Sequence, residues 1–296
     1  MSLRRSSDNS LLLLAALSIA ILADSATAAD FSQFRGPSGD GHAPATGLPV
    51  TWNPTKHVTW QVPVAGMGWS SPIVVGNRLF LTTAVAKTGG GPDDQSLRAI
   101  CLDIKTGKTV WDEEVFARNH VSTQGLLHSK NSHASPTPIS DGKKLYVHFG
   151  TEGTAALDLV TGRIAWKMQD LAYVPRHGGG GSPALVDGLL VVTCDGQDEQ
   201  YVAAIDKRDG HVVWTRNRSG EMSDQNPLKK TYTTPLVIDD PQQVQLISPG
   251  ANWVYSYDPA TGRELWRASY GQLGFSTVPR PVVGHGMGYV CTSFMQ

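Results

Sequence analysis

The sequence predicts an all-β protein, a β-propeller built from four-stranded antiparallel blades. Three observations support this fold class. A motif Asp-x3-Gly-x3-Trp occurs four times at intervals of about 50 residues. A Ser-Pro or Thr-Pro pair opens an apolar segment ahead of each copy, and the 296 residues include 31 glycines and 18 prolines, a turn-rich composition. A repeat period near 50 residues is typical of propellers, in which each repeat is one four-stranded blade.

The motif aligns four repeats along the chain. Its copies are Asp103, Gly107 and Trp111; Asp158, Gly162 and Trp166; Asp206, Gly210 and Trp214; and Asp258, Gly262 and Trp266. Successive motif tryptophans are 55, 48 and 52 residues apart, and Trp60 lies 51 residues before the first of them. We therefore expect four complete blades and an outer strand of another blade around Trp60.

The predicted strands and turns follow the same order in each repeat. The first strand follows a hydroxyl residue and a proline, which is tolerated where a strand begins; these pairs are Ser71-Pro72, Ser135-Pro136, Ser182-Pro183 and Thr234-Pro235. A tight turn such as Asp187-Gly188 predicts a hairpin into the second strand. The third strand ends at the motif aspartate, as in residues 155–158, and the fourth runs into the motif tryptophan, as in residues 163–166.

The motif residues have structural roles in this interpretation. The aspartate side chain accepts hydrogen bonds from backbone N–H groups two or three residues later, and the glycine supplies a positive φ. The tryptophan packs against the neighbouring blade, where such a ring buries on the order of 200 Å². Cys101 precedes its motif aspartate by two residues, where the other repeats carry Ala156, Ala204 and Ser256, so we expect it to fill a small-residue position in a strand.

The second copy shows a family resemblance. Residues 156–166, Ala-Leu-Asp-Leu-Val-Thr-Gly-Arg-Ile-Ala-Trp, resemble the tryptophan-docking repeat of the PQQ-like (pyrroloquinoline quinone) propellers. That superfamily includes quinoprotein alcohol dehydrogenases and the non-catalytic BamB-type factors of outer-membrane protein assembly, and the resemblance runs from Trp52 to the C-terminus. It implies a parent fold of eight blades.

Measured against eight blades, the chain is expected to be a fragment. Residues 279–284 would open a fifth blade and residues 289–292 would form its second strand, after which the sequence stops at Gln296. A propeller that ends within a blade leaves an unpaired edge. We therefore expect residues 1–296 expressed alone to be poorly soluble or oligomeric.

The N-terminus has the features of a signal peptide spanning residues 1–28. Arg4 and Arg5 precede an apolar run over residues 11–22, and Ala26-Thr27-Ala28 is a small-x-small cleavage pattern. Twelve apolar residues are too few to span about 30 Å of hydrocarbon as a stable anchor, although an uncleaved signal anchor is the alternative. We expect cleavage after Ala28 and a periplasmic protein that does not span the membrane, with an N-terminal extension over residues 29–51 and the propeller over residues 52–296.

Charge and cysteine content exclude several function classes. The formal net charge is −1 and the longest basic cluster is Lys229-Lys230, so nucleic-acid binding is not expected. The three cysteines, Cys101, Cys194 and Cys291, are widely spaced and provide neither a disulfide framework nor a metal-binding pair.

The repeats differ mainly in loops that share one face of the predicted disc, and this loop-rich face is the candidate binding surface. Its candidate residues are His128, Asn131, His133, Arg176, His177, Asp195 and Asp198. The three histidines could hold a metal, but their spacing matches no recognised ligand signature, and no metal site is assigned. The run Gly178–Gly181 lacks the Lys-Ser/Thr of a phosphate loop, and we interpret it as conformational freedom at the channel mouth.

Two functions remain open. The first is a non-catalytic scaffold that binds a protein or another cell-envelope component, with no cofactor and no catalytic residue. The alternative is a quinoprotein oxidoreductase, for which the resemblance implies PQQ with calcium, a vicinal cysteine disulfide, an acidic base and calcium ligands from Glu, Asn and Asp. The chain has no adjacent cysteines, so the scaffold is the favoured reading.

Overall fold

The computed structural model describes residues 30–43, 45–91, 93–119, 127–240, 242–271 and 274–292. Over these residues the chain forms four four-stranded sheets and one two-stranded sheet, all antiparallel. The helical elements with described bounds are the 3₁₀ turns η1 (Gly150–Glu152) and η2 (Asn226–Leu228). The predicted all-β fold with four complete blades is confirmed, whereas the predicted signal peptide lies outside the described residues.

The strands follow chain order in every sheet, so each sheet is an up-and-down meander. The first sheet contains β1 (Ile73–Val75), β2 (Arg78–Ala86), β3 (Gln95–Asp103) and β4 (Thr109–Arg118). The second contains β5 (Ile139–Ser140), β6 (Lys144–His148), β7 (Thr154–Asp158) and β8 (Ile164–Met168). The third contains β9 (Ala184–Val186), β10 (Leu189–Asp195), β11 (Gln200–Asp206) and β12 (Val212–Asn217). The fourth contains β13 (Leu236–Ile238), β14 (Gln245–Pro249), β15 (Trp253–Tyr257) and β16 (Glu264–Ser269).

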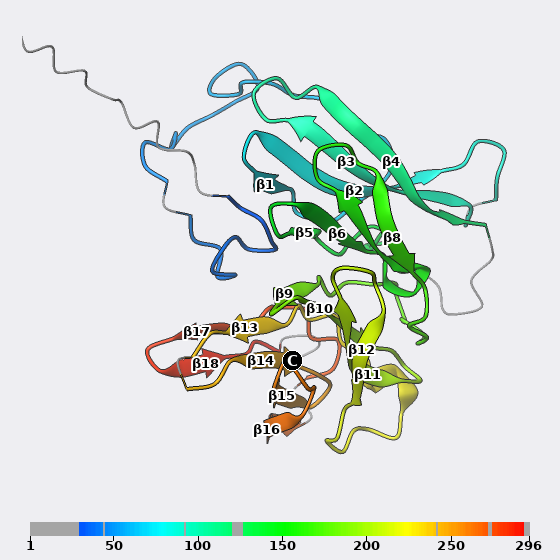
Figure 1. Cartoon of the computed structure of the whole chain (residues 1–296), viewed down its shortest axis with the longest axis vertical. Helices are drawn as coiled ribbons and strands as arrows, with labels where there is room; N and C mark the ends of the chain where they lie inside the picture. The colour runs from blue at the N-terminus through cyan, green and yellow to red at the C-terminus, as the bar shows by residue number, and fades with distance from the viewer. Residues whose placement is uncertain are drawn as a thin grey trace, which may run out of the picture.

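The sheets are the blades of a propeller (Figure 1). The first two sheets occupy the upper half of that view, and the third, the fourth and the two-stranded sheet occupy the lower half. The core consists of clusters between consecutive blades, with Leu157 fully buried in the first cluster, Leu190 in the second and Tyr255 in the third. Each blade is therefore stabilised mainly by its neighbours, as in other repeat folds.

The motif tryptophan of one blade rests on the motif glycine of the next. A Cβ added to Gly162 would lie 2.7 Å from Cδ2 of Trp111, and one added to Gly210 would lie 2.6 Å from Cε3 of Trp166. The indole Nε1 of Trp166 also donates a hydrogen bond to the carbonyl oxygen of Lys207, at 3.1 Å. The predicted packing of the tryptophan against the neighbouring blade is confirmed.

The ends of this series differ from its middle. Trp60 packs on Gly107, and its Nε1 donates to the carbonyl oxygen of Ile104 at 2.8 Å. Residues 58–65 nevertheless form no strand, so the expected outer strand around Trp60 is wrong. At the other end, Trp266 is 43% exposed and donates within its own blade, to Oε1 of Gln245 at 2.9 Å.

The other motif positions also have the predicted roles. Oδ1 of Asp158 accepts hydrogen bonds from the backbone N–H groups of Val160 and Thr161, at 3.2 and 2.8 Å, and Gly162 has φ +73°. Cys101 lies directly opposite Trp111 in the β3–β4 ladder. The same register places Ala156, Ala204 and Ser256 opposite the other motif tryptophans. A small residue is therefore required beside the ring.

The fifth blade begins as predicted but with a shifted second strand. β17 (Val282–Gly284) pairs with β18 (Met287–Tyr289), whereas the sequence predicted residues 289–292. The turn explains the shift, because His285 and Gly286 both have positive φ, 54° and 72°. A two-residue turn of this kind starts the second strand immediately after the glycine.

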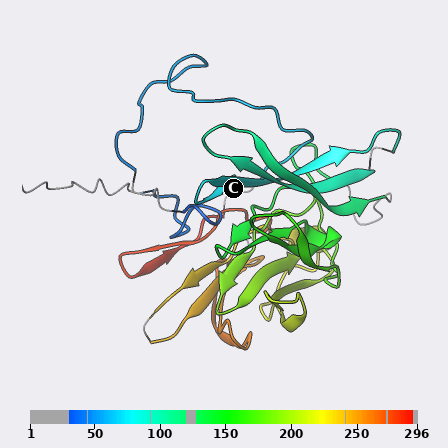
Figure 2. The same ribbon diagram turned by 45° about the horizontal axis from the view of Figure 1, so that its top comes forward.

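Residues 30–36, here called the axial segment, join three blades. Phe31 and Val74 exchange backbone hydrogen bonds of 2.8 and 2.9 Å, which adds the axial segment to the edge of β1. The N–H of Ser140 in the second blade donates to the carbonyl oxygen of Ser32 at 3.0 Å. The fifth blade contributes Arg280, whose Nη1 donates to the carbonyl oxygen of Phe34 at 2.8 Å. Figure 2 shows the blue N-terminal chain beside the red β17–β18 hairpin.

Candidate functional site

A cavity of about 450 Å³ lies where the innermost strands of the five blades begin. The segment preceding each first strand contributes to its wall: Trp69, Thr137, Ser182, Thr234 and Ser276, one from each blade in chain order. Phe34 of the axial segment completes the lining. Because the connections between blades also border it, the cavity opens on the loop-rich face.

Hydroxyl groups connect the segments around this cavity. The N–H of Ser71 donates to Oγ1 of Thr137 at 3.0 Å, and the N–H of Thr137 donates to Oγ of Ser182 at 2.9 Å. The N–H of Ser182 then donates to Oγ1 of Thr234 at 2.9 Å. In the second blade the hydroxyl therefore comes from Thr137-Pro138, two residues after the Ser135-Pro136 pair that the sequence suggested. Each hydroxyl residue lies two residues before its strand. The proline between them has no N–H to donate, which is tolerated where a strand begins.

The first two long connections meet at the cavity. The rings of His128 and His177 are 5.1 Å apart and nearly perpendicular. Nδ2 of Asn131 donates to the carbonyl oxygens of His177 and Gly179, at 2.7 and 3.2 Å. Three of the seven candidate residues, His128, Asn131 and His177, thus line the same cavity.

Burial and nearby positive charges lower the pKa of His177. Burial lowers the pKa of His177 below its ordinary value, and the nearby cations Lys230 and Arg176, together with His128, lower it further. His128 uses its Nδ1 to accept a hydrogen bond from the N–H of Lys130 at 3.1 Å. The pair is therefore held in place by backbone contacts and lies in a positive environment.

The other four candidates lie elsewhere or contact the site through their backbone. The carbonyl oxygen of Arg176 accepts a hydrogen bond from the hydroxyl of Tyr232, which lines the cavity. His133 is half-buried, and burial followed by the charge of Arg118 lowers its pKa. Oδ1 of Asp198 accepts from the N–H of Val174 at 2.6 Å.

Asp195 is a buried ion-pair partner. Its Oδ2 lies 2.7 Å from Nη2 of Arg218, and both side chains are almost fully inaccessible. Oγ1 of Thr231 donates to the same carboxylate at 2.9 Å, while Nη2 of Arg218 also donates to Oγ of Ser248 in the fourth blade. The pair therefore links the third and fourth blades from inside the protein.

The glycine run is closely packed. A Cβ added to Gly178 would lie 2.6 Å from Cδ1 of Leu127, and one added to Gly181 would lie 2.7 Å from the carbonyl oxygen of Thr233. Only small gaps separate this run from its neighbours, so its interpretation as conformational freedom is wrong. Glycine is required here because other chain segments approach its backbone closely.

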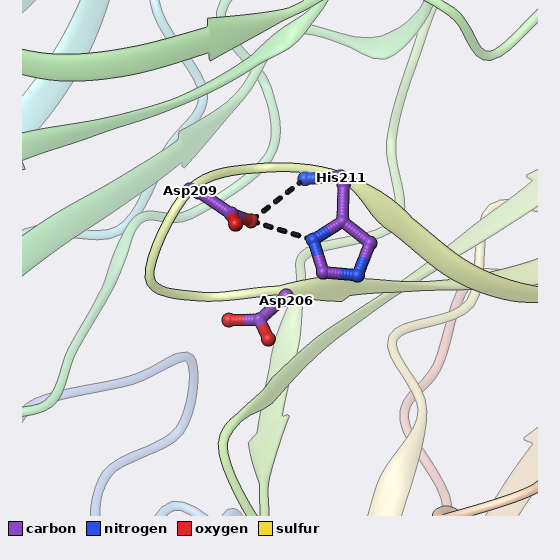
Figure 3. A group of neighbouring side chains, drawn as sticks. All are labelled: Asp206, Asp209 and His211. Atoms are coloured by element: carbon purple, nitrogen blue, oxygen red, sulfur yellow. Dashed lines mark hydrogen bonds and ion pairs between the residues drawn. The ribbon is translucent and has the colours of Figure 1, made fainter.

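A group of possible metal ligands lies in the turn of the third repeat (Figure 3). Ligand atoms of Asp206, Asp209 and His211 lie within 4.8 Å of one another. Both carboxylates already have partners: Nη2 of Arg208 is 2.6 Å from Asp206, and Nδ1 of His211 is 2.7 Å from Asp209. The hydrogen bond from Arg208 lowers the pKa of Asp206 to about 2. We interpret this group as a charged turn. Elsewhere among the described residues, His128, His133 and His177 do not converge as a ligand set.

Carboxylates are missing from the lining of the cavity, as far as the described residues extend. Neither aspartate nor glutamate is among its lining residues, so it offers no acidic base and no carboxylate ligand for calcium. Cys101 and Cys194 are buried in different blades, and Cys291 is exposed beyond β18. Over the described ranges, no helix is both long and apolar enough to cross a bilayer.

Comparison with known proteins agrees with this architecture. A family model described as "Outer membrane protein assembly factor BamB" matches residues 43–168 and 101–295, which together cover most of the chain. No curated protein matches the chain.

Several solved structures are similar to this chain at low sequence identity. Quinohemoprotein alcohol dehydrogenase from Comamonas testosteroni has a TM-score of 0.60 and 12% identity, covering 84% of this chain and 42% of its own. BamB from Moraxella catarrhalis has a TM-score of 0.44 and 19% identity, covering 70% of this chain and 49% of its own. A europium-containing methanol dehydrogenase has a TM-score of 0.48 and 16% identity, covering 72% of this chain and 43% of its own.

This chain spans about half or less of the length of each of these structures. The similarity to the quinohemoprotein alcohol dehydrogenase, with its TM-score of 0.60, supports the fold, and the family match rests on the sequence itself. The protein belongs to the PQQ-repeat β-propeller family, the family of the outer-membrane protein assembly factor BamB model.

Proposed function

We propose that this protein is an exported, non-catalytic propeller of the cell envelope that binds a segment of a partner protein. The binding site is the cavity on the loop-rich face. The observation that carries this proposal is the composition of the cavity wall, to which all five blades contribute. A surface built jointly by five blades is rigid, which suits recognition.

The lining combines apolar and hydrogen-bonding groups. Trp69 and Val278 are 62% and 60% exposed although they lie in a concave site, and such exposed apolar side chains mark binding surfaces. Hydroxyls and the histidine pair surround them and can orient a bound chain. The volume of about 450 Å³ is within the range of ligand sites and would accommodate a few side chains of an extended segment.

Selection from a random peptide library on the purified mature protein tests the proposal. We expect peptides whose binding is lost in Val278→Asp and weakened at least tenfold in Trp69→Ala. Val160→Asp is the matched control, because Val160 is 77% exposed in the β7–β8 turn, which topology places on the opposite face. This control should bind the selected peptides like the wild type.

Two results would contradict the proposal. One is a failure to select peptides, or binding that the cavity substitutions leave unchanged. The other is an oxidoreductase activity: titration with pyrroloquinoline quinone and calcium would give a quinone absorbance and dye reduction.

A further inference from the structure

The buried cations of the protein fall into two classes. Arg118 and Arg218 are buried with carboxylate partners, Glu152 at 2.8 Å and Asp195 at 2.7 Å. Lys230 and Arg280 are equally buried, but no carboxylate lies within ion-pair distance of either among the described residues. Burying a cation without a counter-charge is unfavourable, so buried cations normally have an anionic partner.

Neither cation lines the cavity itself, but each contacts a residue of its wall, and Nζ of Lys230 also lies 5.0 Å from the centroid of the Phe275 ring. Nζ of Lys230 donates to the carbonyl oxygen of Pro227 at 2.6 Å, and the carbonyl oxygen of Lys230 accepts from the N–H of Ser276, a lining residue. Arg280 holds Phe34, another lining residue. Arg280 also precedes Pro281 and β17, the position at which the other blades carry a hydroxyl. Its Nε is buried and has no hydrogen-bond partner.

More cations lie at the cavity mouth. Lys130 lines the cavity from the β4–β5 connection, and Arg176 lies next to His177 on the β8–β9 connection. Neither Lys130 nor Arg176 forms an ion pair over the part of the chain that the structure describes. Together with His128 and His177 they form a surface that we call the basic rim: His128, Lys130, Arg176 and His177.

The acidic residues nearest this surface are engaged elsewhere. The carboxylate of Asp195 is held by Arg218 and Thr231, and that of Asp198 accepts the N–H of Val174. The lining itself includes neither aspartate nor glutamate. The local positive charge therefore persists in a protein whose formal net charge is −1, and such a local field attracts anions more strongly than the overall charge does.

The titration of the buried cations agrees with this geometry. Burial, followed by the charge of Arg176, lowers the pKa of Lys230 to about 8. Burial, followed by the charge of Arg35, lowers the pKa of Arg280 to about 10. Burial is the largest cause of both shifts, as expected for cations without a carboxylate partner.

We propose that the cavity binds an acidic segment of a partner protein, in which an aspartate or glutamate neighbours an apolar side chain. The carboxylate would lie at the basic rim, and the apolar side chain would pack on Trp69 and Val278. This inference rests on the proposed function and specifies the chemistry of the partner. An extended peptide satisfies both halves of the site at once, because successive side chains of an extended chain point in opposite directions.

Two synthetic decapeptides test the proposal by isothermal titration calorimetry. One alternates glutamate with leucine, the other alternates glutamine with leucine, and both are acetylated and amidated so that their termini are uncharged. We expect the glutamate peptide to bind at least tenfold more tightly and to lose affinity as salt concentration rises. Citrate and inorganic phosphate are added as competitors in a further titration.

The basic rim is tested with a pair of matched double variants. Lys130→Gln with Arg176→Gln should weaken binding of the glutamate peptide about tenfold, since each exposed ion pair contributes about 0.7 kcal/mol. Lys105→Gln with Lys143→Gln removes the same charge from exposed turns on the opposite face and should leave the affinity unchanged. Binding of the glutamine peptide should be unaffected in both.

The pH dependence of peptide binding provides a further test. The charged groups that act on His177 are Lys230 from the β12–β13 connection, Arg176 from its own connection and His128 from the β4–β5 connection. Lowering the pH from 8 adds positive charge first to Lys230, whose pKa is about 8, and then to His177, whose pKa lies below its ordinary value, so affinity for the glutamate peptide should rise severalfold as the pH falls. His177→Gln should reduce that rise.

The outcomes separate this inference from the proposed function. Equal affinity for the two decapeptides, or equal losses in the two double variants, would overturn the acidic-segment assignment. Citrate or phosphate binding as tightly as the glutamate peptide would also overturn it, in favour of a small anion. Library peptides that bind the cavity without enrichment in acidic residues would refute only this inference, whereas the absence of any binding peptide would refute both.

Discussion

A single glycine determines how closely two blades approach. Gly210 lies beneath the ring of Trp166, and its φ of +86° closes the turn that Asp206 begins. Two requirements thus coincide at one residue: a left-handed backbone and the absence of a side chain. These two requirements explain why the motif has glycine at this position.

Gly210→Ala separates these requirements when it is compared with Gly188→Ala in the same blade. Gly188 has almost the same φ, +85°, but a Cβ there would meet no atom within 4 Å. We expect a loss of about 1 kcal/mol for Gly188→Ala from the backbone alone. Gly210→Ala should lose about 2–4 kcal/mol, because the added methyl also displaces Trp166.

Urea denaturation of the two variants measures both losses. Equal destabilisation would show that the contact between the glycine and the tryptophan ring does not limit blade packing.

At the scale of strands and blades, the buried pair of Arg218 and Asp195 ties neighbouring elements together. Arg218 follows β12, Asp195 ends β10, and the guanidinium also reaches Ser248 in β14. Its planar donors bond Asp195 of β10 and Ser248 of β14 at once, which a lysine could not do. Blades three and four are therefore joined by polar contacts around Arg218 and by apolar contacts in the cluster that contains Tyr255.

Removing one partner of this pair should be worse than removing both. Asp195→Ala leaves the Arg218 cation buried and unpaired, and we expect a loss of about 3–5 kcal/mol in the free energy of unfolding. The double variant Asp195→Leu with Arg218→Met should recover much of that loss, because apolar side chains of similar volume fill the same space. Chemical denaturation checks this, and a double variant as unstable as the single one would argue against it.

Periodic features of these elements could be predicted from the sequence, and pairwise contacts could not. The motif spacing gave four blades, the aspartate turns and the position of Cys101, because each depends on local geometry that recurs. The loop pattern predicts Asp195 as a binding residue of the loop-rich face and misses its buried pairing, because its partner Arg218 lies 23 residues later and belongs to no repeat pattern. The contact between His128 and His177 likewise depends on how two irregular connections fold. The packed glycine run depends on neighbours from four other segments, at Leu127, Gly150, Thr193 and Thr233.

For the whole molecule, the axial segment is the contact that joins distant parts of the chain. It pairs with β1, bonds to the second blade and is held by Arg280 of the fifth blade. It also supplies Phe34 to the cavity. The N-terminal region is thus part of the propeller centre, although no repeat signal in the sequence indicated it.

Deletion of residues 30–41 tests this role. We expect faster amide exchange in β17 and β18, because the bond between Arg280 and Phe34 is lost. Amide exchange in β10 and β11 should stay unchanged, because the axial segment forms its hydrogen bonds with other parts of the propeller. These two strands serve as the internal control. Unchanged exchange in β17 and β18 would show that the segment merely rests on the propeller.

The bond between Arg280 and Phe34 also imposes an order on folding. These residues are 246 positions apart in the chain, so their contact cannot form until nearly the whole described chain has been synthesised. Consecutive blades can pack as they emerge, since each needs only its neighbour. In an unfolded chain, closing so long a loop would cost more entropy than any contact between consecutive blades, so this contact is favoured only after the blades have packed. Phe34 therefore reaches its place in the cavity wall after the blades are built, and the cavity is complete only at the end of folding.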